Sequence, residues 1–213
     1  MLVIESFATV FTAGMFLSGL TIVKRIKSGP SIVPIPSFPA FATLVNCLLW
    51  CKYGLVTHDV LMVLVNTIGV ITSIYLLYNH YFFTKHQNYL EKSALIAASL
   101  VTVLFIYVDY LAGTRATNHL GLACCLSCVI MFSSPLVSIR TVVTTHSTYT
   151  LSFPLSVTSF LTSSLWALYG YTIHDSFVFA PNFAGAVLAT IQVSMFAIYR
   201  NRDPAPAPAE TPV

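Results

Sequence analysis

Charged side chains are scarce in this sequence, in which Asp, Glu, Lys and Arg together make up 8% of 213 residues. A soluble domain usually carries about 25% charged residues, so this chain has too few to cover a water-facing surface. Because 56% of its residues are hydrophobic, we expect an integral membrane protein with little room for a separate soluble domain. The net charge of +3 does not predict a nucleic-acid partner, because the basic residues lie at the ends of apolar segments.

Several motifs are missing as well. The sequence contains no Asn-x-Ser/Thr site, so N-glycosylation is not expected. No basic residues precede the first apolar stretch, which we therefore interpret as a spanning helix rather than a cleaved signal. No nucleophile–base pair, phosphate-binding loop or cluster of metal ligands occurs at workable spacing. These absences argue against an enzyme and give no reason to expect a cofactor or a metal ion.

The five cysteines all fall within apolar stretches: Cys47, Cys51, Cys124, Cys125 and Cys128. The last two have the spacing of a CxxC motif, but a metal or redox site would need a second group of ligands, and none is evident. We expect these cysteines to be small apolar packing residues.

Seven stretches are long enough to span a bilayer, which takes roughly 20 apolar residues. They cover approximately residues 2–23, 38–56, 59–82, 93–113, 118–143, 153–172 and 176–199. They are continuously apolar rather than alternating, which favours helices over a β-barrel. The predicted fold class is an all-α integral membrane protein with seven transmembrane helices.

A long internal repeat runs through the chain. Trp50 and Trp166 are 116 positions apart, and so are Asn66 and Asn182. The same displacement relates Tyr53-Gly54 and His58-Asp59 to Tyr169-Gly170 and His174-Asp175. A fixed displacement marks a duplicated unit, which here contains three helices.

The fourth predicted helix has no counterpart in the repeat. A three-helix unit crosses the membrane an odd number of times, so one extra crossing is needed to give both copies the same orientation. We therefore expect two parallel repeats related by an axis along the membrane normal. The predicted organisation is a first repeat at 1–84, a linker helix at 85–115, a second repeat at 116–202 and a disordered Pro/Ala-rich tail at 203–213.

The repeated Trp and Asn residues are the candidate substrate-binding residues. In each copy the Trp lies eight residues before the turn histidine and the Asn eight residues after it, which places all four side chains about 12 Å below that turn. Transporters bind substrates near the midplane, where their repeats meet. Asn66 and Asn182 can donate and accept hydrogen bonds to a neutral polyhydroxylated ligand, and the faces of Trp50 and Trp166 suit a pyranose ring.

Two alternatives apply to these residues. The asparagines could instead hydrogen-bond helices to one another, and the tryptophans could belong to the interfacial aromatic belt. The recurrence of the Trp and Asn pair at matched depth favours a binding site.

A second group of residues suggests an inner gate. Pro39 and Pro154 begin predicted helices, Pro135 interrupts one, and Gly19 occupies the position equivalent to Pro135. Each allows a helix to bend. Ordinary helix starts are the alternative for Pro39 and Pro154.

The remaining candidates are titratable. Asp109 is the one acid that we place well inside a predicted span, and a hydrated position near the helix end is favoured there over proton coupling. For His58 and His174, which adjoin Asp59 and Asp175, capping of a turn is favoured over ligand contact.

Basic residues predict the orientation of the chain. Eight of them share one side: Lys24, Arg25, Lys27, Lys85, Lys92, Arg140, Arg200 and Arg202. Lys52 and Arg115 lie towards the other side. The positive excess marks the cytosol, so the N-terminus is expected outside or in a lumen and the C-terminus in the cytosol. The final Thr211-Pro212-Val213 has the shape of a weak PDZ ligand, with a plain frayed end as the alternative.

Several segments together resemble the SWEET sugar facilitators, specifically the animal members, over residues 5–200. They are Gly14-Met15-Phe16 with Gly19-Leu20, Val65-Asn66-Thr67-Ile68-Gly69, Met131-Phe132-Ser133-Ser134-Pro135-Leu136, Leu151-Ser152-Phe153-Pro154-Leu155 and Pro181-Asn182-Phe183-Ala184-Gly185. The resemblance implies bidirectional facilitated diffusion of mono- or disaccharides by alternating access, in homo-oligomers.

The resemblance also implies roles for residues. Asn66, Asn182 and Trp166 match positions that contact sugar, whereas the position of Trp50 is more variable in the family. The proline set of the family is matched at Pro39, Pro135 and Pro154, and Gly19 departs from the plant pattern.

The function predicted from the sequence is a sugar uniporter in the plasma membrane or the Golgi. A pocket between two indoles has limited room, which favours a glucose-like monosaccharide. The alternatives are a receptor or scaffold that does not transport, and a carrier of another small neutral solute. An exporter of cationic amino acids should place an acid or a Pro-Gln turn in the site helices, and neither is present.

Overall fold

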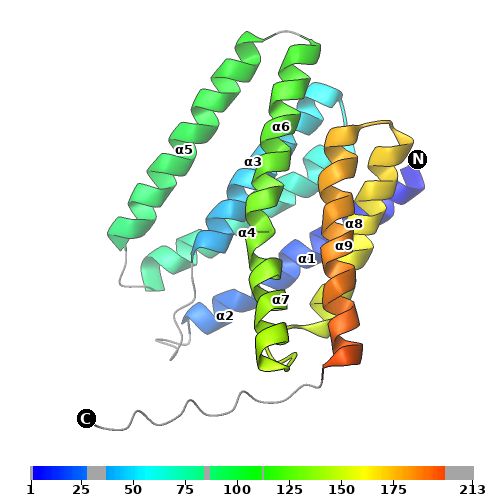
Figure 1. Ribbon diagram of the computed structural model, residues 1–213. Coiled ribbons are helices and arrows are strands. Elements are labelled where there is room, and N and C mark those ends of the chain that lie inside the picture. Colours follow the sequence, from blue (N-terminus) through cyan, green and yellow to red (C-terminus); the bar gives the residue numbers. More distant parts are fainter. Residues whose placement is uncertain (1, 28–36, 84–86, 112, 200–213) are drawn as a thin grey trace.

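The computed structural model describes residues 2–27, 37–83, 87–111 and 113–199. These residues form helices joined by short turns (Figure 1). The helices are α1 (Leu2–Gly19), α2 (Thr21–Lys27), α3 (Phe38–Thr57), α4 (Val60–Phe83), α5 (Gln87–Tyr110), α6 (Thr114–Met131), α7 (Ser133–Thr145), α8 (Phe153–Thr172) and α9 (Ser176–Ile198). The predicted tail, including Thr211-Pro212-Val213, lies outside the described residues.

The described helices make up the seven predicted crossings, because α1 continues into α2 and α6 into α7. Six crossings are long and apolar enough to span a membrane by length and composition alone. The seventh is α8, which is rich in Ser and Thr. Hydroxyl groups in it donate to carbonyls one turn back, as in the 2.8 Å bond from Thr158 Oγ1 to the Pro154 carbonyl. The all-α, seven-helix prediction is confirmed.

Two predicted helix boundaries were wrong. The fourth helix was expected over 93–113, but α5 begins at Gln87 and ends at Tyr110. The fifth was expected to begin at 118, but α6 begins at Thr114. An apolar run marks only the part of a helix that lies in hydrocarbon, and polar residues such as Glu91 and Lys92 continue the helix beyond it.

Each repeat is a bundle in which the third helix lies between the first and the second. Thus α4 packs against both α1 and α3, and α9 packs against both α6 and α8. The repeats meet where α1 lies against α8 and where α6 lies against α3 (Figure 1). This set of contacts is unchanged when the repeats are exchanged, as expected for two parallel copies related by a twofold axis.

The linker helix α5 stands at the edge of the molecule and contacts α3, α4 and α6 (Figure 1). An ion pair joins Lys52 of α3 to Asp109 of α5, and the Lys52 amine lies over the ring of Phe105. The side chain of Asp109 is 62% exposed. Asp109 therefore has the exposed position near the end of its helix that the sequence favoured.

The four predicted bending residues lie at helix starts or interruptions. α1 ends at Gly19 and α2 begins two residues later, while Pro135 sits in the first turn of α7, just after α6 ends. Proline has no N–H to donate to the carbonyl one turn back, which accounts for the break between α6 and α7. Pro39 and Pro154 each occupy the first turn of their helix.

Two short turns connect the helix pairs at one end of the bundle, which we call the histidine end after His58 and His174. Both histidines adopt the left-handed backbone conformation, with φ of 60° and 57°, and so terminate α3 and α8. Asp59 and Asp175 follow, and their carboxylates accept hydrogen bonds from backbone N–H groups of the next helix. These aspartates therefore cap the starts of α4 and α9, whereas the turn role expected for His58 and His174 lies in their backbone conformation.

Candidate functional site

A cavity of about 150 Å³ lies between the two repeats. Its lining residues come from α1, α3, α4, α6, α8 and α9: Thr12, Phe16, Asn46, Trp50, Met62, Val65, Asn66, Cys128, Thr162, Trp166, Val178 and Asn182. The structure thus brings together all four predicted substrate-binding residues. None of the described lining residues carries a charge, so the cavity suits a neutral ligand.

The lining follows the internal repeat. Ten of the twelve residues form five pairs that are 116 positions apart: Thr12 with Cys128, Asn46 with Thr162, Trp50 with Trp166, Met62 with Val178, and Asn66 with Asn182. The cavity therefore has two walls of equivalent position, one from each repeat.

The two asparagines have the same local geometry. Asn66 Nδ2 donates to the Met62 carbonyl at 2.9 Å, and Asn182 Nδ2 donates to the Val178 carbonyl at 2.8 Å. Each bond lies within the asparagine's own helix, so these amides do not tie one helix to another. Among the described residues, the second amide hydrogen and the carbonyl oxygen of each asparagine remain for a ligand.

Both indoles are buried, at 7% exposure each, which does not fit an interfacial belt. Trp50 packs edge-on against Tyr53 with ring centroids 5.5 Å apart, and Trp166 packs against Tyr169 in the same way at 5.6 Å. Each indole is thus held under the tyrosine one turn nearer the histidine end.

The indole N–H groups are directed across the cavity to the other repeat. Trp166 Nε1 donates to Thr12 Oγ1 at 2.9 Å. Trp50 lies against the thiol of Cys128, which occupies the position equivalent to Thr12. Because these contacts fix both rings, the indole faces are preorganised before any ligand enters.

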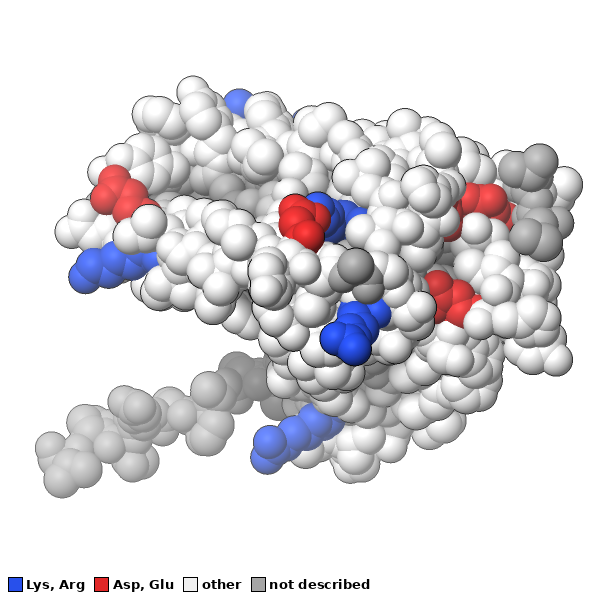
Figure 2. Space-filling view, turned by 90° about the horizontal axis from the view of Figure 1, so that it is seen from above, with Lys and Arg blue, Asp and Glu red and all other residues white. Residues whose placement is uncertain are grey.

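Two reciprocal hydrogen bonds close the cavity at the histidine end. Tyr53 Oη donates to Asp175 Oδ2 at 2.6 Å, and Tyr169 Oη donates to Asp59 Oδ2 at 2.9 Å. Each bond joins one repeat to the other, and the 116-position displacement converts one into the other. We call these the two Tyr–Asp bonds. Figure 2 looks down on this end, where most of the visible surface is uncharged.

Glu5 adds a third carboxyl group to this region. It is 8% exposed and contacts both Asp59 and Tyr169. The sequence had directed attention to Asp109 as the acid inside a span, but Glu5 is the one that the fold buries. Its position near the start of an apolar stretch gave no sign of this, and the equivalent position in the second repeat is Gly121.

A hollow of about 400 Å³, which we call the vestibule, lies towards the opposite end of the bundle, and apart from Met15 its lining comes from the second repeat. Many of the lining residues carry hydroxyl groups, among them Ser134, Ser156 and Ser159. It shares Thr162 with the central cavity, and Thr162 Oγ1 lies 3.5 Å from Met15 Sδ. Pro135 also lines the vestibule, so one predicted bending residue faces it.

Sequence reasoning missed several lining residues. Thr12, Asn46 and Thr162 were not singled out, and Cys128 was interpreted as a packing residue. Asn46 Oδ1 accepts hydrogen bonds from Ser127 Oγ at 2.7 Å and Cys128 Sγ at 3.4 Å. The repeat could not reveal these positions, because their chemistry differs between the two copies.

The chain matches a known family twice. The sequence model of a family described as "Sugar efflux transporter for intercellular exchange" matches residues 2–88 and 118–204. These two matches are displaced by the same 116 positions as the Trp and Asn pairs.

Individual proteins are similar over most of the chain. The chain is 33% identical over 200 residues to "Sugar transporter SWEET1" of Drosophila pseudoobscura pseudoobscura, covering 92% of this chain and 88% of that protein. It is 32% identical over 189 residues to the Homo sapiens protein of the same name, covering 88% and 86%. A solved structure described as a eukaryotic SWEET transporter is similar with a TM-score of 0.86 and 26% identity, covering 92% of this chain and 94% of that one.

The duplicated three-helix bundle, the paired lining of its central cavity and the similarity over most of the chain agree with one another. The chain belongs to the SWEET family of sugar transporters.

Proposed function

We propose that this protein is a facilitative, bidirectional uniporter for a glucose-like monosaccharide. The observation that carries the proposal is the uncharged cavity between the repeats, with an indole and an amide from each. Asn66 and Asn182 would hydrogen-bond sugar hydroxyls, and the faces of Trp50 and Trp166 would pack against the ring. No charged side chain lines the cavity among the described residues, which favours an uncoupled carrier.

The size of the cavity supports a single sugar ring. An apolar cavity of about 150 Å³ is known to hold a six-membered ring such as benzene. The cavity here has about that volume, so a disaccharide would require it to widen. We therefore propose a monosaccharide as the substrate.

The two ends of the cavity support alternating access. The Tyr–Asp bonds close the histidine end, while the vestibule lies at the other end. From the distribution of basic residues, we assign the histidine end to the outside or lumen and the vestibule to the cytosol. The structure then corresponds to an inward-facing state, and rocking of the repeats would break the Tyr–Asp bonds and close the vestibule. Bending at Gly19, Pro39, Pro135 and Pro154 would serve as the inner gate.

Uptake of radiolabelled glucose into liposomes that contain the purified protein tests the proposal. Uptake without any proton or sodium gradient is the expected result. The double variant Asn66→Ala/Asn182→Ala, and Asn182→Ala alone, should abolish uptake while the protein remains folded and inserted. Retained flux in a correctly inserted Asn182→Ala protein would refute the assignment of the site.

Thr67→Ala is a matched control for the asparagine variants. Thr67 follows Asn66 and donates to a carbonyl one turn back in the same way, at 2.8 Å to Val63, but it does not line the cavity. Glucose uptake by the Thr67→Ala variant should equal that of the unmodified protein. Absence of uptake with glucose, fructose, galactose and trehalose would favour another small neutral solute or a partner-binding role.

The assembly and location of the protein form the rest of the proposal. We propose a homo-oligomer with one pathway in each protomer, located in the plasma membrane, the Golgi or both. Size measurement in detergent and localisation of a tagged chain would test these two points.

A further inference from the structure

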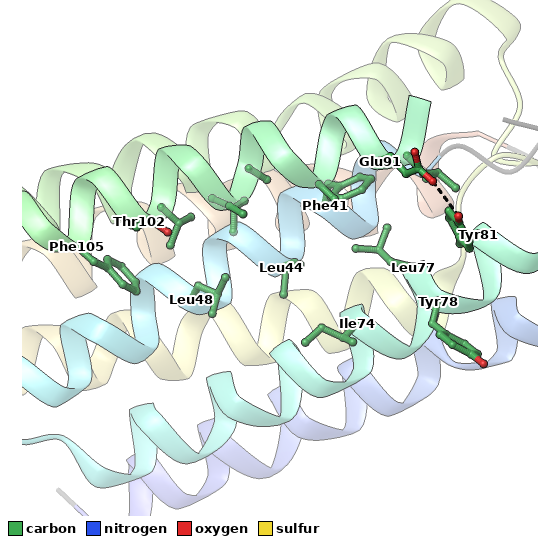
Figure 3. Close-up of a pocket in the computed structure, with 16 residues that line it drawn as sticks. Phe41, Leu44, Leu48, Ile74, Leu77, Tyr78, Tyr81, Glu91, Thr102 and Phe105 are labelled. Carbon is green, nitrogen blue, oxygen red and sulfur yellow. Dashed lines mark hydrogen bonds between the residues drawn. The ribbon is translucent and has the colours of Figure 1, made fainter. Parts of the chain in front are cut away.

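A large groove lies outside the sugar site, between α3, α4 and α5. Its volume is about 670 Å³, within the range of roughly 300–1,000 Å³ that is typical of sites for compact organic ligands. Figure 3 shows its walls, with Leu44 and Leu48 on α3, Leu77 on α4 and Phe105 on α5. Each of these three helices is long and apolar enough to cross the membrane, and the lining residues Ile74 and Tyr78 are exposed, so we expect the groove to open to lipid.

Small residues form the middle of the wall on α5. Ala94, Ala97 and Ala98 lie there, between Leu90 on one side and Val101 and Phe105 on the other, whereas the wall formed by α3 and α4 carries branched and aromatic side chains throughout. The ion pair between Lys52 and Asp109 holds α5 against α3 beyond Phe105, near the histidine end. The middle of the groove therefore has a flat face on α5 and an uneven face on α3 and α4.

The one charged side chain that lines the described groove, Glu91, lies at its other end. Tyr81 Oη donates to Glu91 Oε1 at 2.8 Å, as the dashed line in Figure 3 shows. The carboxylate of Glu91 can accept further hydrogen bonds. Apart from these two groups and the hydroxyls of Tyr78 and Thr102, the lining is hydrocarbon.

The negative charge of Glu91 restricts which lipid head group can bind at this end of the groove. No described Lys or Arg lines the groove, while Glu91 contributes a carboxylate. A phosphate group would be repelled by that carboxylate, whereas a hydroxyl group could donate to it. The complementary lipid is thus uncharged and has a small hydroxyl head.

The length of the groove agrees with such a lipid. Leu90 and Phe105 mark its ends on α5, and fifteen residues of helix rise roughly 22 Å. This exceeds half of a ~30 Å hydrocarbon core, so a molecule one leaflet long would fit. A rigid ring system also loses little conformational freedom on binding, which suits a fixed slot.

We propose that this groove binds one sterol molecule, with its hydroxyl group at Glu91 and its flat ring face on the alanines of α5.

A photoreactive sterol tests the proposal on the full chain in phosphatidylcholine vesicles. Cross-links found by mass spectrometry should fall on α3, α4 and α5 around the groove. Excess unlabelled sterol should compete, whereas its epimer with inverted hydroxyl and a single-chain fatty-acyl lipid should compete poorly. Cross-links spread over the lipid-facing surface, or equal competition by the fatty-acyl lipid, would overturn the proposal.

Two variants separate the groove from the rest of α5. Ala98→Phe should fill the groove and reduce cross-linking about tenfold. Ile96 is 61% exposed and does not line the groove, so Ile96→Phe should leave cross-linking unchanged. Equal cross-linking in both variants would contradict the proposal. If Ala98→Phe does not fold, Glu91→Leu serves instead, because loss of a hydrogen bond to a charged group should weaken sterol binding roughly tenfold. Glucose uptake by Ile96→Phe and Glu91→Leu checks their folding independently of sterol.

Discussion

The aspartates at the histidine end each accept hydrogen bonds from the start of a helix and from a tyrosine of the other repeat. Asp175 caps α9 by accepting from Phe177 N at 2.8 Å, and it also accepts from Tyr53 Oη of the other repeat. Asp59 does the same at the start of α4 with Tyr169. The N–H groups at the start of the helix hold each carboxylate in place. The carboxylate therefore keeps its position whether or not the tyrosine is bonded to it. Removal of a tyrosine hydroxyl should therefore weaken the closure without unfolding the turn.

Under the proposed alternating access, the variants Tyr53→Phe and Tyr169→Phe should shift the protein towards the outward-facing state. A hydrogen bond to a charged group contributes about 1.5–3 kcal/mol, so each variant should raise the outward-facing population roughly tenfold or more. Cys128 lines the central cavity and reports on this change. Its labelling by a charged, membrane-impermeant thiol reagent added outside should increase in both variants.

The reporter can be verified with Cys128→Ser, which should abolish the increase because serine has no thiol to label. The cavity should accommodate this hydroxyl group, since the equivalent position in the first repeat is Thr12. Unchanged labelling in Tyr53→Phe and Tyr169→Phe would show that the Tyr–Asp bonds do not hold the outer side closed. A larger effect at Tyr169 would implicate Glu5, which contacts Tyr169 and has no counterpart at Tyr53.

At the scale of helices, close packing at the turns depends on glycine. A Cβ at Gly170 would lie 2.5 Å from the backbone nitrogen of Phe179, and a Cβ at Gly54 would lie 2.9 Å from Val63 Cγ2. These glycines let α8 approach α9 and α3 approach α4 just before each chain reversal. The Tyr-Gly pair of each repeat thus combines a closing hydroxyl with a close helix contact.

Gly170→Ala should destabilise the protein by about 1–3 kcal/mol, because backbone atoms must move to admit the methyl group. Gly14→Ala is the control, since a Cβ there meets nothing within 4 Å and the residue lies inside α1. It should be neutral, or stabilising by about 0.5–1 kcal/mol. Thermal unfolding in detergent should rank Gly170→Ala below the unmodified protein and Gly14→Ala at or above it. Equal melting temperatures would contradict the packing argument.

The break between α6 and α7 should matter for the rate of transport. Pro135→Ala would supply an N–H to the Met131 carbonyl and favour one continuous helix. We expect slower sugar exchange but unchanged sugar affinity, because Pro135 lines the vestibule and not the central cavity. Comparison of exchange rates with equilibrium glucose binding checks this. An equal loss of both would assign Pro135 to the stability of the site instead.

For the molecule as a whole, the sequence predicted the features that follow from amino-acid composition and from the internal repeat. Hydropathy predicted the seven crossings, and the repeated Trp and Asn pairs predicted four residues that line one cavity. It could not predict contacts between positions that differ in the two copies, such as Thr12 with Trp166, or the burial of Glu5. These follow from how the two bundles pack, which periodicity within one helix does not encode.

Epitope tags on the two termini test the proposed orientation of the chain. Small epitope tags at the two termini should be digested from opposite sides of the membrane, because seven crossings separate them. Protease on the outer side of intact cells, or in the lumen of sealed vesicles, should remove the N-terminal tag. Protease on the cytosolic side should remove the C-terminal tag. The reverse pattern would place the vestibule outside and would invert the proposed assignment of the inward-facing state.

The reciprocity of the Tyr–Asp bonds has a consequence for ancestry. Each repeat supplies one donor and one acceptor to the other, so a lone three-helix unit could have formed the whole site by pairing with an identical copy. Fusion of two such units through α5 would then allow the two halves to differ in sequence. Cys128 could diverge from Thr12, and Glu5 could arise opposite Gly121. Selectivity for a sugar can therefore evolve in one wall while the paired closure is inherited unchanged.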